Sequence, residues 1–459
     1  MCSSDLSNTI DKLWSERPAL PNEKVFELDV KFAGSPRSEK FSAVRAEMAK
    51  KDADYYLISS LDDVAWLLNL RGRDVPNTPV FYAHVLLGKD DAILFVSPEK
   101  ISADIAEALE SDGCKTVGYG EIGRRLSEIE IGKRLLFDSA RVSAGLAGFV
   151  PEGVKVVREK EITTRLKAVK NETEIKNIRN ANIREGVMLT RLMVRLEKIF
   201  ASGGALHEAD VCEIINELRK PTQNYLGPGF ETIAAYGKNA ASMHYNPSGR
   251  GDEILNEGFL LIDTGAQYFD GTTDITRTFA VGALTDEMKR DFTLLLKGHI
   301  ALASAIFLHG ATGTGLDAFA RAPLWANGMN YRSGTGHGIG FCLSVHEGPH
   351  GISQRNNEVK LEKGMLVTNE PGVYKEGRHG IRTENLLLVK ELFKNDDGTF
   401  MGFEIITYFP IDLSAIDASL LTHDEIKFLN GYHANVFEIL SPLLDEEESN
   451  WLKRATKLL

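Results

Sequence analysis

The stretch FLLIDTGAQYFDGTTDITRTF at residues 259–279 predicts two strands joined by a short turn. Its first half is an apolar run that ends in a carboxylate, Asp263, beside a glycine, and its second strand opens with Asp274. A charge at the end of a buried run is costly unless it is paired or bound to a metal ion. Both aspartates are therefore candidates for a functional site.

We expect the turn between these strands at Asp270–Gly271, because Asp-Gly is a strong hairpin signal. With a two-residue turn there, Asp263 and Asp274 share one face of the hairpin but stand four positions out of register, about 13 Å apart at normal strand rise. The hairpin alone makes no site, and a bulge or a sharp twist has to bring the two carboxylates together.

Three more chemically capable residues lie at the margins of apolar or glycine-rich segments. They are His337 in SGTGHGIG, Glu370 at the end of GMLVTNE, and Glu384 in GIRTENLLLV. Each one alone is more often a helix cap, an ion-pair partner or a surface turn. Together with Asp263 and Asp274, however, they make four carboxylates and one imidazole in similar positions, and chance explains such a set poorly. Oxygen-rich sites with one histidine suit hard divalent ions such as Mn²⁺, with Co²⁺, Fe²⁺ or Zn²⁺ as alternatives. A pair of such ions can activate a water and polarise a carbonyl, which is hydrolytic chemistry.

The composition excludes several other classes. A formal net charge of −12 argues against a protein that tracks nucleic-acid phosphates. The cysteines Cys2, Cys114, Cys212 and Cys342 are far apart and form no CxxC pair, which favours reduced thiols in the cytoplasm over a disulfide framework. No basic-then-apolar leader and no run near the roughly 18 apolar residues of a membrane span is visible. No nucleic-acid or membrane partner is expected.

The fold class predicted from the pattern is α/β followed by α+β. Residues 1–25 are interpreted as a linker or the remnant of a missing first domain. Strand-like runs at 55–58, 80–87, 92–96, 135–138 and 154–157, with a helix between them, predict an α/β domain over 26–164. The stretch at 163–179 is charged and strongly helix-forming, and a domain boundary is expected near 165. The second unit is expected to comprise residues 165–412, and residues 413–459 a helical extension. Its last helix, with Trp451 on the apolar face, is expected to dock on its own domain rather than on a membrane.

The strings DTGAQYFDGTTDITRTF, GTGHGIGFCLSVHEGP, NEPGVY and GIRTEN resemble the metal-binding strands of the pita-bread metallopeptidases, most of all the cytosolic long form of the aminopeptidase P (Xaa-Pro aminopeptidase) family. LWSERPALP at 13–21 and WLLNLRGRDVPNTPVF at 66–81 resemble that form's linker and middle domain. The resemblance implies a creatinase-like α/β domain, a pita-bread catalytic domain and two divalent metal ions, usually Mn²⁺. It also implies a cytoplasmic homodimer that cleaves peptides with proline at the second position, by attack of a metal-bridged hydroxide.

The resemblance assigns metal-binding roles to the candidate ligands. Asp263 resembles the ligand that one ion holds in bidentate fashion, and Asp274 and Glu384 resemble the bridging carboxylates. His337 and Glu370 complete the second ion's shell, and Glu370 would also handle protons at the bridging water.

Further roles follow from the same resemblance. His346 is similar to the histidine that stabilises the tetrahedral intermediate, His244 to one that lines the substrate pocket, and Arg382 to an arginine that supports the site. Without the motif context, His244 is an ordinary loop histidine and His346 beside Glu347 an ordinary surface pair. Ser333 departs from the family, which usually has a histidine there, and this affects how the proline side of the substrate is bound.

Two alternative functions stay open. One is a prolidase restricted to Xaa-Pro dipeptides. The other is a non-catalytic pita-bread module that binds peptides or histones, although such modules lose metal ligands and this sequence keeps all of them. A thiol mechanism through Cys342 and a phosphate loop at GATGTG, 310–315, carry little weight, because the first fits a small buried apolar residue and the second lacks the Lys–Ser/Thr ending. The family's long form has an extra N-terminal domain, so the chain is expected to be a truncated relative or an incomplete reading frame.

Overall fold

The computed structural model describes residues 13–255 and 257–459. The chain divides into two compact units, one ending at Lys167 and the other comprising Ala168–Leu459. Cys2 and the first half of the predicted linker lie outside the described residues. Among the helices of the described ranges, none combines the length and the apolar character that a membrane crossing requires.

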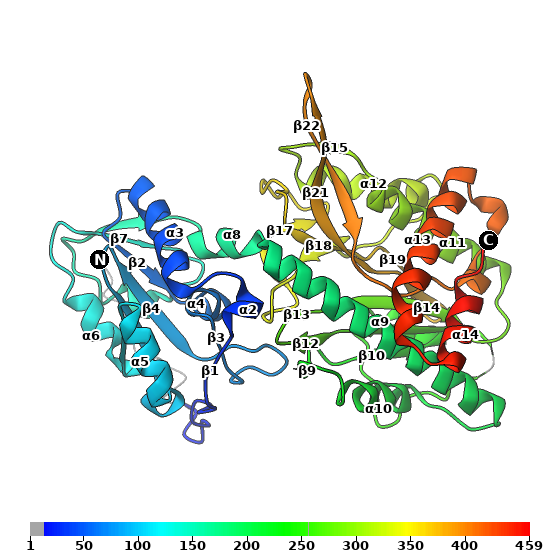
Figure 1. The fold of residues 1–459 in the computed structure, drawn as a ribbon, viewed down its shortest axis with the longest axis horizontal. Helices are drawn as coiled ribbons and strands as arrows, with labels where there is room; N and C mark the ends of the chain where they lie inside the picture. Colours follow the sequence, from blue (N-terminus) through cyan, green and yellow to red (C-terminus); the bar gives the residue numbers. More distant parts are fainter. Residues whose placement is uncertain (1–12, 256) are drawn as a thin grey trace. The chain divides into compact units, whose positions relative to one another are not determined.

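The first unit is built on a mixed six-stranded sheet with the strand order β6-β5-β4-β2-β7-β8 (Figure 1). Its strands are β2 (Tyr55–Ile58), β4 (Ala83–Gly88), β5 (Ala92–Val96), β6 (Cys114–Val117), β7 (Arg134–Phe137) and β8 (Lys155–Arg158). Its longer helices are α3 (Arg37–Lys50), α4 (Leu61–Leu68), α5 (Ala103–Ser111) and α6 (Ile122–Ser127). Ile122 and Leu126 of α6 are buried in one cluster with Leu57 and Leu135 of the sheet, so α6 covers one sheet face.

The five strands predicted in this unit are all present: those at 55–58 and 92–96 have the predicted bounds, and those at 135–138 and 154–157 are shifted by one residue. The run at 80–87 enters the sheet only at Ala83. The residues before it bond to a loop instead, because the Asp74 N–H donates to Val80 O at 3.1 Å and the Tyr82 N–H donates to Asp74 Oδ2 at 2.7 Å. The buried Asp74 side chain also pairs with Lys100, which fixes this loop.

The stretch 163–179, predicted to be strongly helix-forming, is helical except at residues 169–171, where two helices meet. The chain forms α8 (Ile162–Ala168), breaks, and starts α9 (Glu172–Ala201). Two contacts make the break: the Lys170 N–H donates to Gly364 O at 3.0 Å, and Asn171 Oδ1 accepts the Glu174 N–H at 2.9 Å as the cap of α9. A capping residue inside a helix-forming run ends one helix and begins another.

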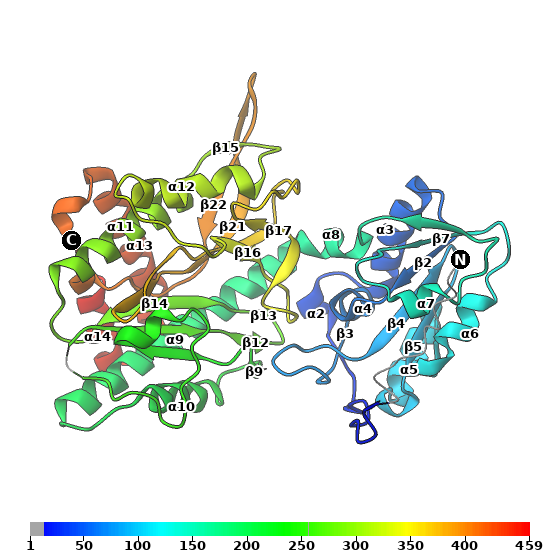
Figure 2. The ribbon, with the colours of Figure 1, turned by 180° about the vertical axis from the view of Figure 1, so that it is seen from behind.

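The second unit surrounds small sheets with long helices (Figures 1 and 2). Three-stranded sheets are ordered β10-β11-β14 and β13-β12-β9, a six-stranded sheet is ordered β15-β22-β21-β18-β16-β17, and β19 pairs with β20. The first two sheets comprise β9 (Tyr225–Pro228), β10 (Ile233–Tyr236), β11 (Phe259–Thr264), β12 (Ala266–Tyr268), β13 (Gly271–Thr272) and β14 (Ile275–Ala280). The others comprise β15 (Phe307–Leu308), β16 (Gly336–Gly338), β17 (Glu347–Ile352), β18 (Leu366–Asn369), β19 (Gly372–Lys375), β20 (His379–Arg382), β21 (Asn385–Asn395) and β22 (Gly398–Ile405).

The helices of this unit bury the main core. Besides α9 they are α10 (Glu208–Arg219), α11 (Asp286–Ala303), α12 (Gly313–Trp325), α13 (His423–Leu440) and α14 (Glu446–Ala455). Trp451 and Leu452 of α14 are buried in one hydrophobic cluster with Leu192 and Leu196 of α9, so the last helix docks on its own unit, as expected. Leu458 lies beyond the end of α14 at Ala455 and is 75% exposed.

The hairpin that carries the two aspartates differs from the prediction in its register. Tyr268 pairs with Gly271, so the turn is Phe269–Asp270 rather than Asp270–Gly271. Asp270 is only 4% exposed, and its carboxylate accepts a hydrogen bond from Arg184 at 2.5 Å. An ion pair to α9 thus fixes Asp270 within the turn.

This register brings the aspartates together without a bulge. Asp263 stands opposite Thr276, and Thr264 opposite Ile275, so Gly265 is the position opposite Asp274. The two aspartates are therefore two positions out of register instead of four. Diagonal neighbours on one face of an antiparallel pair lie roughly 7–8 Å apart, which is close enough for their carboxylates to share a site.

Candidate metal centre

Three donor groups from different strands meet at one point in the second unit. Asp274 immediately precedes β14, His337 is the centre of β16, and Glu384 joins β20 to β21. One ligand atom of each lies within 4.8 Å of the others. The three side chains come from segments about 50 to 110 residues apart, so only the packing of the sheets brings them together.

The other two predicted ligands lie against this group. His337 Nε2 is 3.3 Å from Glu370 Oε1 and 3.5 Å from Asp274 Oδ2. Asp263 Oδ2 accepts a hydrogen bond from Arg382 at 2.6 Å. Its other oxygen, Oδ1, is buried and finds no hydrogen-bond partner within the described ranges. All five candidate ligands line a single cleft of about 920 Å³.

The orientation of His337 leaves one ring nitrogen free to bind a cation. Its Nδ1 lies 2.9 Å from the carbonyl oxygen of Gly338. A carbonyl can only accept, so Nδ1 carries the proton and Nε2 presents its lone pair to the carboxylates. Metal-binding histidines are typically held in this way by a hydrogen bond at the other nitrogen.

Two threonine hydroxyls hold the glutamates in place. Thr276 Oγ1 donates to Glu384 Oε2 at 2.8 Å, and Thr368 Oγ1 donates to Glu370 Oε1 at 3.1 Å. The Thr368 oxygen also accepts the backbone N–H of His337 at 3.0 Å. One hydroxyl therefore fixes two candidate ligands relative to each other.

The carboxylates at this site repel one another in a buried place. Burial raises the pKa of Asp274 well above its ordinary value, and the charges of Glu384 and Asp263 raise it further. Burial likewise raises the pKa of Glu384, with added repulsion from Glu370 and Asp263. Burial and Asp263 raise the pKa of Glu370 to about 7, against the opposing effect of Arg382. Positive charge at this point relieves the repulsion, as metal binding does.

Arg382 provides one permanent positive charge beside the cluster. Besides Asp263, its guanidinium donates to the Tyr374 hydroxyl at 2.7 Å and, through Nε, to Thr276 Oγ1 at 3.1 Å. Burial works to lower the arginine's pKa, but Tyr374 and Asp263 outweigh it and raise the pKa, so Arg382 stays charged. It binds one oxygen of Asp263, Oδ2, and leaves the other, Oδ1, without a hydrogen-bond partner among the described residues.

The remaining predicted residues also lie on the cleft. The rings of His346 and His337 meet edge to face with their centroids 4.3 Å apart. Burial, and then the neighbouring His337, lower the pKa of His346, which keeps its ring neutral at pH 7. His244 is exposed at the cleft wall, and Ser333 lines the cleft with a hydroxyl that has no hydrogen-bond partner among the described residues.

Sequence reasoning missed the residues that support the ligands. Thr276 and Tyr374 lie inside quoted motifs, DITRTF and NEPGVY, but were given no role. For Thr276 a signal was present, because it lies two residues after Asp274 and therefore on the same face of the strand. Tyr374 gave no such signal, because its contact with Arg382 depends on how β19 pairs with β20.

The donor set fits divalent cations. It offers four carboxylates and one imidazole, a mixture that suits Mn²⁺ and similar ions. Asp263 Oδ1 is a buried acceptor with no hydrogen-bond partner among the described residues, and such an acceptor is costly unless a cation satisfies it.

Comparison with known proteins agrees with this geometry. The model of metallopeptidase family M24 matches residues 176–391, the creatinase/prolidase N-terminal domain matches 16–174, and the C-terminal region of peptidase M24 matches 399–459. A probable Xaa-Pro aminopeptidase P of Laccaria bicolor is 40% identical, over 97% of this chain and 71% of that protein. The chain belongs to metallopeptidase family M24. A second M24 relative, the probable Xaa-Pro aminopeptidase P of Coprinopsis cinerea, is also 40% identical, over 98% of this chain and 76% of its own length.

Solved structures of M24 proteins share the fold. An X-prolyl aminopeptidase from Caenorhabditis elegans, described as a cytosolic enzyme with a di-nuclear active site, is 33% identical and superposes with a TM-score of 0.93, over 99% of this chain and 76% of that one. A prolidase from Pyrococcus furiosus, 22% identical, superposes with a TM-score of 0.61 over 79% of this chain and 98% of its own. The fold class predicted from sequence, a creatinase-like domain followed by a pita-bread domain, is confirmed. The domain boundaries at 25, 164 and 412 stay predictions.

Proposed function

We propose that this M24 protein is an aminopeptidase that hydrolyses the bond between the first residue of a peptide and a proline at the second position. The convergence of Asp274, His337 and Glu384 within 4.8 Å in an open cleft is the observation that carries the proposal. The relatives at 40% identity bear names that specify Xaa-Pro substrates, which supports the specificity.

The ligands divide between two divalent ions, with manganese as the proposed metal. Asp263 would hold one ion, Asp274 and Glu384 would bridge the pair, and His337 with Glu370 would hold the other. When bound, such ions supply Lewis acidity and lower the pKa of a coordinated water. The name of the Caenorhabditis elegans enzyme, with its di-nuclear site, supports the number of ions.

The chain's own residues position substrate and donors. Arg382 fixes Asp263 at 2.6 Å and is itself fixed by Tyr374, so the ligand cannot rotate away from the cleft. His346, being neutral, offers one N–H to an oxygen that gains negative charge during hydrolysis. His244 lies where it can contact the substrate at the cleft wall.

The experiment that tests the proposal compares three substrates after Mn²⁺ loading: an Xaa-Pro dipeptide, an Xaa-Pro-Yaa tripeptide and a matched Xaa-Ala-Yaa tripeptide. We expect cleavage of the Xaa-Pro-Yaa peptide, weak or no cleavage of the Ala peptide, and free Xaa as the product. Cleavage of the dipeptide alone would establish the prolidase instead. Metal loading without cleavage of any of the three would favour the peptide-binding module.

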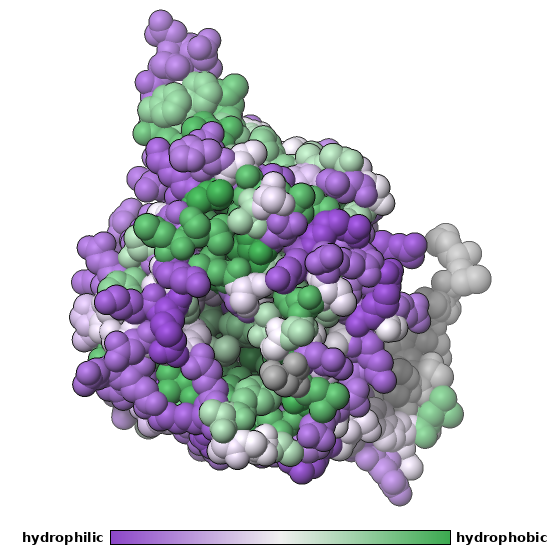
Figure 3. Space-filling model, turned by 90° about the vertical axis from the view of Figure 1, so that its right-hand side faces the viewer, coloured by the Kyte–Doolittle hydropathy of each residue, from purple (hydrophilic) through white to green (hydrophobic). Residues whose placement is uncertain are grey.

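Two further parts of the proposal concern the protein's environment. We infer a homodimer, and exposed apolar side chains on the second unit support it: Phe319 and Trp325 on α12 are 41% and 45% exposed, and Phe393 on the projecting β21–β22 hairpin is 48% exposed. Figure 3 shows hydrophobic residues over the lower part of that hairpin. A cytoplasmic location is consistent with free thiols at Cys114 and Cys342. Sedimentation and cell fractionation test these two points.

A further inference from the structure

Arg277 on β14 is a buried cation whose bonds all go to neutral groups. It is 3% exposed. Its N–H groups donate at distances between 2.6 and 3.0 Å to the carbonyl oxygens of Thr276, Glu384, Phe409 and Pro410 and to the side chains of Asn385 and Tyr432. No carboxylate is among these partners in the described part of the chain. A buried guanidinium without an ion-pair partner needs a structural or functional reason.

Arg277 lies directly behind a candidate metal ligand. Successive side chains of a strand point to opposite faces, so Arg277 and Thr276 lie on opposite sides of β14. Thr276 holds Glu384 from the cleft side, through its hydroxyl at 2.8 Å and its carbonyl oxygen, which accepts the Glu384 N–H at 3.0 Å. Arg277 holds the carbonyl oxygen of the same Glu384 at 2.6 Å from the other side. The ligand is thus fixed from both faces of β14.

Two other bonds of Arg277, to the carbonyl oxygens of Phe409 and Pro410, reach residues 407–412, named here the C-terminal segment. Tyr432 of α13 accepts a hydrogen bond from Arg277 at 2.9 Å, and its oxygen lies 2.7 Å from the carbonyl of Phe409, to which Arg277 also donates at 2.7 Å. The next residue of α13, His433, accepts the N–H of Ile411 at 3.1 Å through Nε2. Helix α13 therefore holds the C-terminal segment and Arg277 together.

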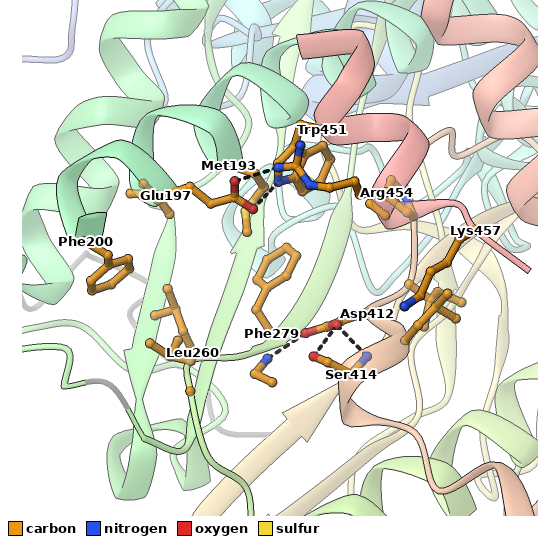
Figure 4. Close-up of a pocket in the computed structure, with 18 of the residues that line it drawn as sticks. Met193, Glu197, Phe200, Leu260, Phe279, Asp412, Ser414, Trp451, Arg454 and Lys457 are labelled. Carbon is orange, nitrogen blue, oxygen red and sulfur yellow. Dashed lines mark hydrogen bonds and ion pairs between the residues drawn. The ribbon is translucent and has the colours of Figure 1, made fainter. Parts of the chain in front are cut away.

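The C-terminal segment is also anchored beside an apolar pocket of about 550 Å³ (Figure 4). Asp412 Oδ2 accepts the N–H of Ala280, the last residue of β14, at 2.8 Å. The ring of Phe409 stacks on that of Trp451 with centroids 6.0 Å apart. Figure 3 shows a hollow with hydrophobic residues on this face of the unit. The segment is therefore bonded to β14 through Phe409, Pro410 and Asp412, and it contacts both C-terminal helices.

We propose that Arg277 and Tyr432 are positioning residues for the metal centre, through which helix α13 and the C-terminal segment hold Glu384 in its ligating position. This inference rests on the proposed function, because it assumes that Glu384 binds a divalent ion. Removing the Tyr432 hydroxyl takes away one acceptor of the buried guanidinium. Asn385 and Phe409 still accept from the two hydrogens of Arg277 Nη2. The carbonyl oxygen of Phe409 loses the Tyr432 hydroxyl as a donor, however, so the C-terminal segment and Arg277 are free to shift, and such a shift loosens the backbone of Glu384.

The test is titration of Mn²⁺ into metal-free protein, followed by calorimetry, for the wild type and the Tyr432→Phe variant. Groups that orient metal ligands typically contribute roughly 10–100-fold to metal affinity, so we expect Tyr432→Phe to weaken Mn²⁺ binding by about tenfold. Arg277→Lys keeps the charge and loses the planar fork, and it should weaken binding at least as much. If Arg277→Lys does not fold, the Tyr432→Phe titration decides.

Tyr408→Phe is the matched control. Tyr408 lies in the same C-terminal segment and is 6% exposed, but its hydroxyl makes no bond to Arg277. It should bind Mn²⁺ like the wild type. A Tyr432→Phe protein with a lower Tm in the metal-free state and unchanged Mn²⁺ affinity would overturn the inference, because the hydroxyl would then serve only the fold. A wild-type protein that binds no divalent ion would refute the proposed function first.

Discussion

Replacing His346 by alanine should slow turnover strongly and leave metal binding intact. The side chain lies on the cleft with its ring against His337, at a centroid distance of 4.3 Å, and the proposed division of the ligands between two ions gives it no metal-binding role. His346 therefore lies beside the metal centre and is not one of its proposed ligands. Its role is therefore to contact the substrate, and the variant should keep its ions.

The magnitude follows from the charge state of the ring. Because burial and His337 lower the pKa of His346, the ring is neutral at pH 7 and carries a single N–H. It can donate one hydrogen bond to the oxygen that becomes negative. Loss of one such donor costs roughly 10²–10³ in kcat. A contact made mainly in the transition state lowers kcat and leaves KM nearly unchanged.

The assay is steady-state kinetics on an Xaa-Pro-Yaa peptide with the metal content measured on the same samples. His309→Ala is the matched control, because His309 is half exposed, pairs with Glu362 and does not line the cleft. Near-wild-type kcat in His346→Ala would show that the residue is a bystander. Loss of an ion would show that it is a ligand, and either result would refute the reasoning.

Three further predictions concern metal, thiols and pH. Asp274→Ala should lose both ions, since the proposed role bridges them, and a variant that retains two ions by elemental analysis would contradict that role. Chelation should abolish activity while thiol alkylation spares it, because Cys342 is fully buried and burial raises the pKa of Cys212 to about 11; loss of activity on alkylation with the metal retained would revive the thiol mechanism. Burial works to raise the pKa of Asp291, but hydrogen bonds from His379, Lys375 and Arg290 lower it to about 2. A carboxyl group whose pKa is lowered by folding stabilises the fold at pH values above its ordinary pKa of 3.8, and this stabilisation is lost as the pH falls toward 2. Asp291→Asn should therefore lower Tm at pH 7, and the difference in Tm between variant and wild type should shrink toward pH 2.

The sequence by itself determined the fold class and the list of candidate ligands. Apolar runs such as YYLI and FLLIDT place strands because a buried run must satisfy its backbone within a sheet, and both formed as predicted. The candidate ligands could be named because carboxylates at the ends of such runs violate the usual exclusion of charge from apolar surroundings. These signals are local, and each is visible within a few residues.

Tertiary structure decided the register, the distances and the support of the site. The turn at Phe269–Asp270 is fixed by a contact between Asp270 and Arg184, 86 residues away, and no local signal could predict it. The helix-forming stretch 163–179 is interrupted where Lys170 bonds to Gly364, a residue still more remote in sequence. Glu384 depends on Arg277, and through it on Tyr432 of a C-terminal helix. The hydrogen-bond partners of buried polar groups depend on how distant segments of the chain pack together. A local sequence pattern therefore does not predict them.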